Sequence, residues 1–115
     1  MPSRQEILIE KVKPDLPIIV YPERQILPKL KENFQDDSIT LETEMVVDDL
    51  LDMKNEGGIV CSLRPSHIPA EKSRVAFLCS LTHFKVKKGE PHYKELETYR
   101  LKRSKRLARQ NRRRF

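Results

Sequence analysis

The sequence predicts a small single-domain α+β protein, in which helices cover a small sheet and a basic C-terminal helix projects away from it. Three observations support this fold class. Short apolar runs rich in β-branched residues are bounded by proline or glycine, as buried strands are. Other segments repeat their apolar residues at intervals of three and four, as amphipathic helices do. The last 16 residues hold nine of the 23 lysines and arginines, so we expect a compact domain over residues 1–99 and a basic arm over residues 100–115.

The length of 115 residues fits one domain, and the content of 37% hydrophobic and 35% charged residues indicates a compact core. No apolar run approaches the roughly 20 residues that span a bilayer. The N-terminal stretch carries charges among its apolar residues, which is not typical of a secretory signal. The sequence therefore predicts a soluble, cytoplasmic protein whose two cysteines are reduced.

Proline divides the first third of the chain into short elements. Residues 6–12 fit either a strand or a short helix. Residues 17–21 are β-branched and aromatic and are bounded by prolines, which predicts a strand. The helical spacing that follows predicts a helix near residues 23–34. Pro28 should bend or divide this helix, because proline lacks the amide donor.

A second helix is predicted over residues 41–54. Ser38 or Thr40 would cap its start, and acidic residues in its first turns suit the helix dipole. Glycines after it would supply the left-handed conformation that helix ends often adopt. Its apolar residues recur at helical spacing and are expected on one buried face: Val46, Val47, Leu50, Leu51 and Met53.

Two runs that share the letters Cys-Ser-Leu are predicted strands, at residues 58–63 and 75–81. The second lies in an apolar stretch for which a helix over residues 70–86 is the alternative. We favour the strand because apolar residues occupy both of its faces, as in a central strand. The predicted sheet therefore contains residues 17–21, 58–63 and 75–81.

A zinc site could be built from Cys61, His67, Cys79 and His83. However, the short cysteine spacings of zinc motifs are missing, and Cys61 on a strand would face the core as a small hydrophobe. A Cys61–Cys79 disulfide is geometrically allowed if the strands are neighbours, but a reducing compartment disfavours it. On a strand, Cys79 and His83 would lie roughly 13 Å apart, too far for a nucleophile and its base. The sequence thus predicts no metal, no cofactor and no enzymatic activity.

The C-terminal helix is predicted to begin near Pro91 and to run to about residue 111. Tyr93, Leu96 and Tyr99 form an apolar stripe that would pack on the body, and the turns beyond Tyr99 would leave it. Like charges at helical spacing destabilise an isolated helix, so we expect a negative partner to order these turns.

The charges of the arm are the strongest functional signal. Residues 100–115 contain no acid, whereas the other 99 residues hold 14 basic and 17 acidic side chains. Arginine outnumbers lysine seven to two in the arm, and guanidinium groups suit phosphate oxygens. The predicted nucleic-acid contacts are Arg100, Lys102, Arg103, Lys105, Arg106, Arg109, Arg112, Arg113 and Arg114. Secondary anion contacts are predicted in the loop over residues 64–74, at Arg64, Lys72 and Arg74.

These residues predict a protein that contacts the phosphates of DNA or RNA without reading sequence, because few aromatic side chains interleave the charges. The alternative is a regulatory or interaction factor whose arm binds an acidic protein partner. The body would serve for docking or for homodimer formation. A membrane partner is not predicted, because the apolar face of the arm is thin.

Overall fold

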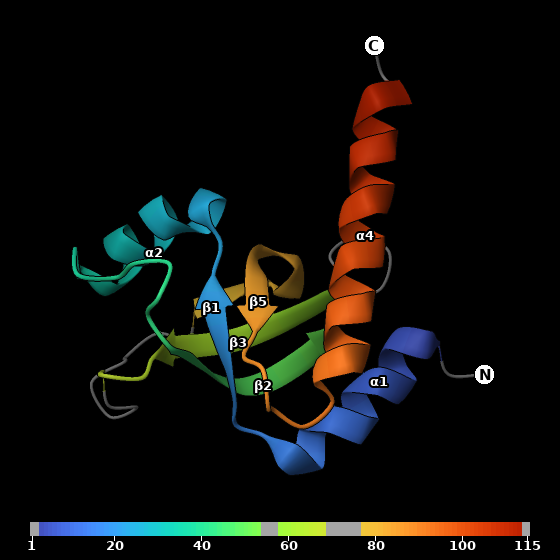
Figure 1. The fold of residues 1–115 in the computed structure, drawn as a ribbon, viewed down its shortest axis with the longest axis horizontal. Helices are drawn as coiled ribbons and strands as arrows, with labels where there is room; N and C mark the ends of the chain where they lie inside the picture. The colour runs from blue at the N-terminus through green and yellow to red at the C-terminus, as the bar shows by residue number, and fades with distance from the viewer. Residues whose placement is uncertain (1–2, 54–57, 69–76, 114–115) are drawn as a thin grey trace.

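The computed structural model describes residues 3–53, 58–68 and 77–113, with the side chains of the last helix described as far as Leu107. The fold is α+β, as predicted: a curled five-stranded antiparallel sheet flanked by helices (Figure 1). The strands are β1 Ile18–Pro22, β2 Met45–Asp52, β3 Ile59–Pro65, β4 Phe77–Ser80 and β5 Phe84–Val86. The α-helices are α1 Arg4–Val12, α2 Leu27–Phe34 and α4 Tyr93–Arg113.

The order of the strands explains the curl of the sheet. The order is β4-β3-β2-β1-β5, so β4 and β5 lie at opposite edges. Along the chain, only the 3-10 turn η4, Leu81–His83, joins these two strands. A flat sheet of five strands would be about 19 Å wide, which so short a turn cannot cross. The sheet therefore curls until its two edges approach one another.

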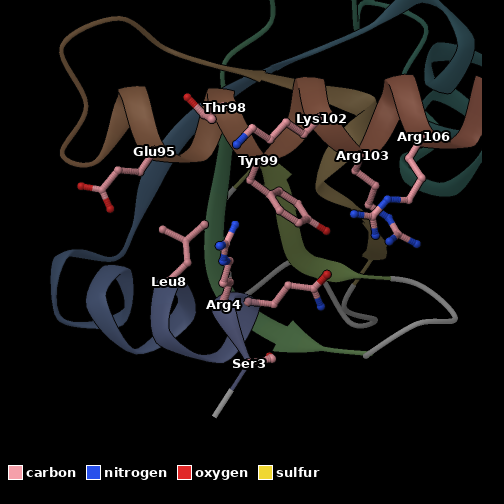
Figure 2. Close-up of a pocket in the computed structure, with 10 residues that line it drawn as sticks. Ser3, Arg4, Leu8, Glu95, Thr98, Tyr99, Lys102, Arg103 and Arg106 are labelled. Carbon is pink, nitrogen blue, oxygen red and sulfur yellow. The ribbon is translucent and has the colours of Figure 1, made fainter. Parts of the chain in front are cut away.

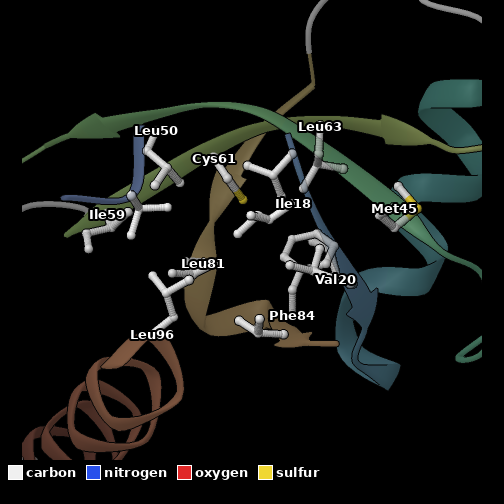
Figure 3. Close-up of a cluster of buried hydrophobic side chains, with 14 of the residues drawn as sticks. Ile18, Val20, Met45, Leu50, Ile59, Cys61, Leu63, Leu81, Phe84 and Leu96 are labelled. Atoms are coloured by element: carbon white, nitrogen blue, oxygen red, sulfur yellow. The ribbon is translucent and has the colours of Figure 1, made fainter. Parts of the chain in front are cut away.

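Buried apolar side chains fill the inner face of the curled sheet (Figure 3). Buried and half-buried residues alternate along β1 and β3, so one face of each strand is directed into the core. Ile18 and Val20 come from β1, and Leu96 enters the same core from α4. The strands predicted at residues 17–21 and 58–63 are confirmed.

The helix predicted over residues 41–54 is wrong. Met45–Asp52 form β2, which pairs with both β1 and β3 in the middle of the sheet. The residues expected to cap the helix make turns before the strand instead. The Thr40 hydroxyl accepts a hydrogen bond from the N–H two residues later, and the Ser38 N–H donates to Asp36.

A β-bulge explains why β2 looks helical in sequence. Val47 lies opposite Leu63, and Asp49 lies opposite the preceding residue of β3, so Asp48 is an extra residue on β2. The extra residue shifts the alternation of side chains. The next inward residue after Val47 is therefore Leu50, at an interval of three that imitates a helix.

Two further expectations depended on the predicted helix and are corrected by the strand. Leu50 is fully buried, but Leu51 is 37% exposed, so the predicted burial of Leu51 is wrong. Gly58 does not follow a helix; it precedes β3 with a positive φ of 63°. Its carbonyl accepts a hydrogen bond from the Met53 N–H at 2.8 Å, which connects the ends of β2 and β3.

Local sequence signals explain the two helical segments that precede β2. Residues 4–12 form α1 rather than a strand, and the Ser3 hydroxyl caps it by accepting a hydrogen bond from the Glu6 N–H at 3.2 Å. The segment predicted at residues 23–34 is divided, as expected. The 3-10 turn η2, Arg24–Ile26, precedes α2, and Pro28 lies in the first turn of α2.

The second Cys-Ser-Leu run is divided between two strands. The prediction for residues 75–81 is confirmed over residues 77–80, whereas Leu81 belongs to η4 and residues 75 and 76 lie outside the described residues. The described part of the run is therefore not the alternative helix. None of the helices in the described ranges is long and apolar enough to cross a bilayer.

Candidate functional site

The first two turns of α4 anchor this helix to the body. Leu96 is fully buried, and Tyr93 and Tyr99 pack against the core, as the predicted stripe requires. The Tyr99 hydroxyl accepts a hydrogen bond from the Ile59 N–H at 2.8 Å. Burial raises the pKa of Tyr99, so this phenol remains protonated well above neutral pH.

Arg100 is the first residue of the predicted arm, but its side chain belongs to the body. The side chain is buried, and its guanidinium lies 2.6 Å from the Glu23 carboxylate. It also bonds Glu97, one turn earlier on the same helix. A cation held by two carboxylates is not presented to a ligand, so we remove Arg100 from the contact set.

The C-terminal half of α4 projects away from the body (Figure 1). Lys102, Lys105 and Arg106 are exposed, and Arg103 is half-buried. The two glutamates of α4 pair with other cations: Glu95 with Lys11, and Glu97 with Arg100.

The basic half of α4 continues to Arg113 without a break. The expectation that a negative partner orders these turns stays a prediction. Arginine, lysine, leucine and alanine are good helix formers, and the anchored first turns remove the cost of nucleation. Arg109, Arg112 and Arg113 lie on the last turns, where side chains are outside the described part, as is the whole of Arg114.

The predicted secondary contacts in the loop do not join this surface. The Arg64 guanidinium donates to the Ile68 carbonyl at 3.0 Å and lies 3.6 Å from Asp48. Arg64 therefore stabilises its own loop and the bulge of β2. Lys72 and Arg74 lie outside the described residues.

A groove of about 390 Å³ runs between the start of α1 and the middle of α4 (Figure 2). Leu8 of α1 and the Tyr99 ring of α4 lie between the two helices and supply its apolar surface. Its cationic side chains come from both helices: Arg4, Lys102, Arg103 and Arg106. The structure thus gathers into one site charges that are far apart in the sequence.

Arg4 is the functional candidate that sequence reasoning missed. It lies in the first turn of α1 and is exposed. The Ser3 cap was a local signal for this helix. No local signal indicated that α1 packs beside α4, because that contact depends on the curl of the sheet.

Gly58 makes room for the side chains at one end of the groove. A Cβ atom on Gly58 would lie 2.3 Å from the Tyr99 hydroxyl oxygen and 2.7 Å from Arg103 Nε. Its φ of 63° also favours glycine. Gly58 therefore sets where Tyr99 and Arg103 lie relative to β3.

The acidic groups next to the groove are already engaged. Glu95 lines the groove, and Lys11 Nζ lies 2.8 Å from its carboxylate. The hydrogen bond from Lys11 holds the pKa of Glu95 below its usual range. Gln5 donates from its amide to Asp52 at 3.0 Å. The cations of the groove are therefore not neutralised by Glu95.

The cysteines and two of the histidines are the residues that the sequence offers for a zinc site. Cys61 and Cys79 are unbridged and lie opposite one another on β3 and β4, where Cys61 Sγ donates to the Cys79 carbonyl at 3.2 Å. Burial raises the pKa of both thiols. His67 Nε2 lies 2.6 Å from the Asp36 carboxylate, and burial lowers the pKa of His83. The described residues contain no group of three or more side chains arranged to hold a metal.

Comparisons with protein-family models, curated proteins and solved structures gave no significant match.

Proposed function

We propose that this protein binds nucleic acid, without catalysing a reaction, through contacts from the projecting half of α4 to phosphates. The observation that carries the proposal is the change at Arg100. Arg100 is buried and neutralised by Glu23 and Glu97, whereas beyond it Lys102, Lys105 and Arg106 are exposed on the projecting half of the helix.

Phosphate chemistry supports this class of ligand. Duplex DNA carries one negative charge per about 1.7 Å of axis, and each phosphate neutralised by a lysine or arginine releases bound counterion. Such contacts bind DNA or RNA with little dependence on sequence. An intracellular location is part of the proposal, because the ligand is found there.

The experiment compares the intact chain with a full-length variant that carries Lys102→Gln, Lys105→Gln and Arg106→Gln. Affinity for a random-sequence duplex and for a single strand is measured at several salt concentrations. We expect log affinity to fall linearly with log salt, and the slope to decrease by about three in the variant, one for each lost phosphate contact. Absence of binding by the intact chain at low salt would refute the proposal.

A second candidate is an acidic protein partner. Leu101 and Leu107 are 50% and 39% exposed on the same half of α4, and apolar side chains among cations suit a protein surface better than a phosphate backbone. In that case Leu101→Ser would weaken binding more than any single lysine substitution. For a nucleic acid, Leu101→Ser would have little effect.

A further inference from the structure

The groove between α1 and α4 combines features that a bare basic helix lacks. Its cations come from two helices, and between these helices lie the apolar side chain of Leu8 and the ring of Tyr99 (Figure 2). We infer that this groove binds one nucleotide of a single strand, with its phosphate against Arg4, Lys102 and Arg103. This inference rests on the proposed function and names the form of nucleic acid that the site prefers.

The charge of the groove selects an anion. Four of its lining side chains are cationic and one, Glu95, is acidic, and Lys11 offsets that acid from outside the groove. Arg4 and the cations of α4 approach the groove from opposite walls. A phosphate between them can accept hydrogen bonds from two directions, which an isolated helix face cannot provide.

The shape of the groove selects a ligand that is anionic at one end and flat and less polar at the other. A volume of about 390 Å³ is at the small end of the range for ligand sites. It suits a single nucleotide, whose sugar and base would lie against Leu8 and the Tyr99 ring while the phosphate meets the cations. Bases of a duplex are stacked inside the helix and cannot enter, so the groove favours a single strand.

Part of the α4 wall, at Tyr99, is held in place before any ligand arrives. The hydrogen bond from the Ile59 N–H fixes the Tyr99 ring against β3, and Gly58 leaves space for the Arg103 guanidinium beside it. A site that is already formed loses less conformational entropy when it binds.

The test uses matched pairs of alanine variants of the full chain. Lys102 lines the groove, whereas Lys105 lies on the same helix outside its lining; Arg4 lines the groove, whereas Lys29 is an exposed cation on α2 at the other side of the sheet. Affinities for a single strand and for a duplex of the same length are measured at constant salt, and circular dichroism melts confirm folding.

We expect Arg4→Ala and Lys102→Ala each to weaken single-strand binding about tenfold, the size of one charge-assisted hydrogen bond. Both variants should change duplex binding less. Lys105→Ala should reduce binding to the two ligands by equal, smaller factors, and Lys29→Ala should change neither affinity. If Lys102→Ala and Lys105→Ala lose the same factor for both ligands while Arg4→Ala, like Lys29→Ala, loses none, the groove inference is wrong and the proposed function stands.

A second measurement tests the groove separately from the basic arm. The intact protein is titrated with a 5′-mononucleotide and, separately, with inorganic phosphate, while amide NMR shifts are followed. Saturable shifts at residues 4–8 and 98–106 with the mononucleotide, stronger than with phosphate alone, support the groove even if no oligonucleotide binds and the proposed function fails. Absence of such shifts with the mononucleotide overturns the inference.

Discussion

The guanidinium of Arg100 lies 2.6 Å from the carboxylate of Glu23, which follows β1. This ion pair connects α4 to a segment 77 residues earlier in the chain. It also marks where α4 leaves the body: Leu96 and Arg100 are buried, whereas Lys102, Lys105 and Arg106 are exposed.

Replacing Arg100 with alanine should therefore reduce stability rather than binding alone. Removal of one partner from a buried ion pair typically costs about 3–5 kcal/mol, because the remaining charge is left without compensation. Since Glu23 and Glu97 are partly accessible, we expect the lower end of that range in urea unfolding. Lys105→Ala, an exposed cation on the same helix, should change the free energy of unfolding by less than about 0.5 kcal/mol. Equal effects would show that the Arg100 pair is not structural.

Gly58→Ala should destabilise the protein more than Gly89→Ala. Both glycines have positive φ, so alanine carries a backbone cost of about 1–2 kcal/mol at each position. Only at Gly58 would the new methyl group also collide with Tyr99 and Arg103, whereas no heavy atom lies within 4 Å of that position at Gly89. The measurement is the unfolding midpoint of each variant. Similar midpoints would contradict the predicted collision of the new methyl group with Tyr99 and Arg103.

Leu50→Ala and Leu51→Ala distinguish the strand from the helix that the sequence suggests. In β2, Leu50 is fully buried and Leu51 is 37% exposed. We expect Leu50→Ala to reduce the free energy of unfolding by about 2–5 kcal/mol and Leu51→Ala by less than about 1 kcal/mol. Comparable losses at both positions would favour a helix with both residues on its buried face.

Asp36 should contribute stability that is lost in acid. Hydrogen bonds from His67 and Ser38 lower the pKa of Asp36 from 3.8 to about 2 in the folded protein. The contribution is present above pH 4, where the unfolded carboxyl is ionised, and decreases as pH falls from about 4 to about 2. The difference in urea midpoint between the parent and Asp36→Asn should therefore shrink over this interval. A difference that does not change between pH 5 and pH 2 would contradict the assignment.

The strands at residues 17–21 and 58–63 could be predicted because local composition and burial agree there. Each is short and β-branched, and each is bounded by proline or glycine. The strand β2 could not be predicted, because Asp48 is accommodated as a bulge only when β3 lies beside it. Its spacing was helical, and its pairing with two neighbours overrode that pattern.

For the candidate site, the sequence identified the cations of the last helix but not the residues that contact them. Composition alone places the cations on the last helix, and the apolar stripe indicates where that helix is anchored. The partner of Arg100 and the neighbour of Lys102 both lie near the other end of the chain, at Glu23 and Arg4. Such long-range contacts follow from the closure of the sheet, which local spacing does not encode.

The continuity of α4 has a consequence for geometry. Thirteen residues follow Arg100 within the same helix, which corresponds to about 20 Å of rigid extension. A strand held along this extension would keep a constant direction relative to the sheet, unlike a strand held by a flexible tether. The protein and its ligand would then rotate in solution as one body. A second partner bound to the sheet would therefore lie at a constant distance from the nucleic acid bound along α4.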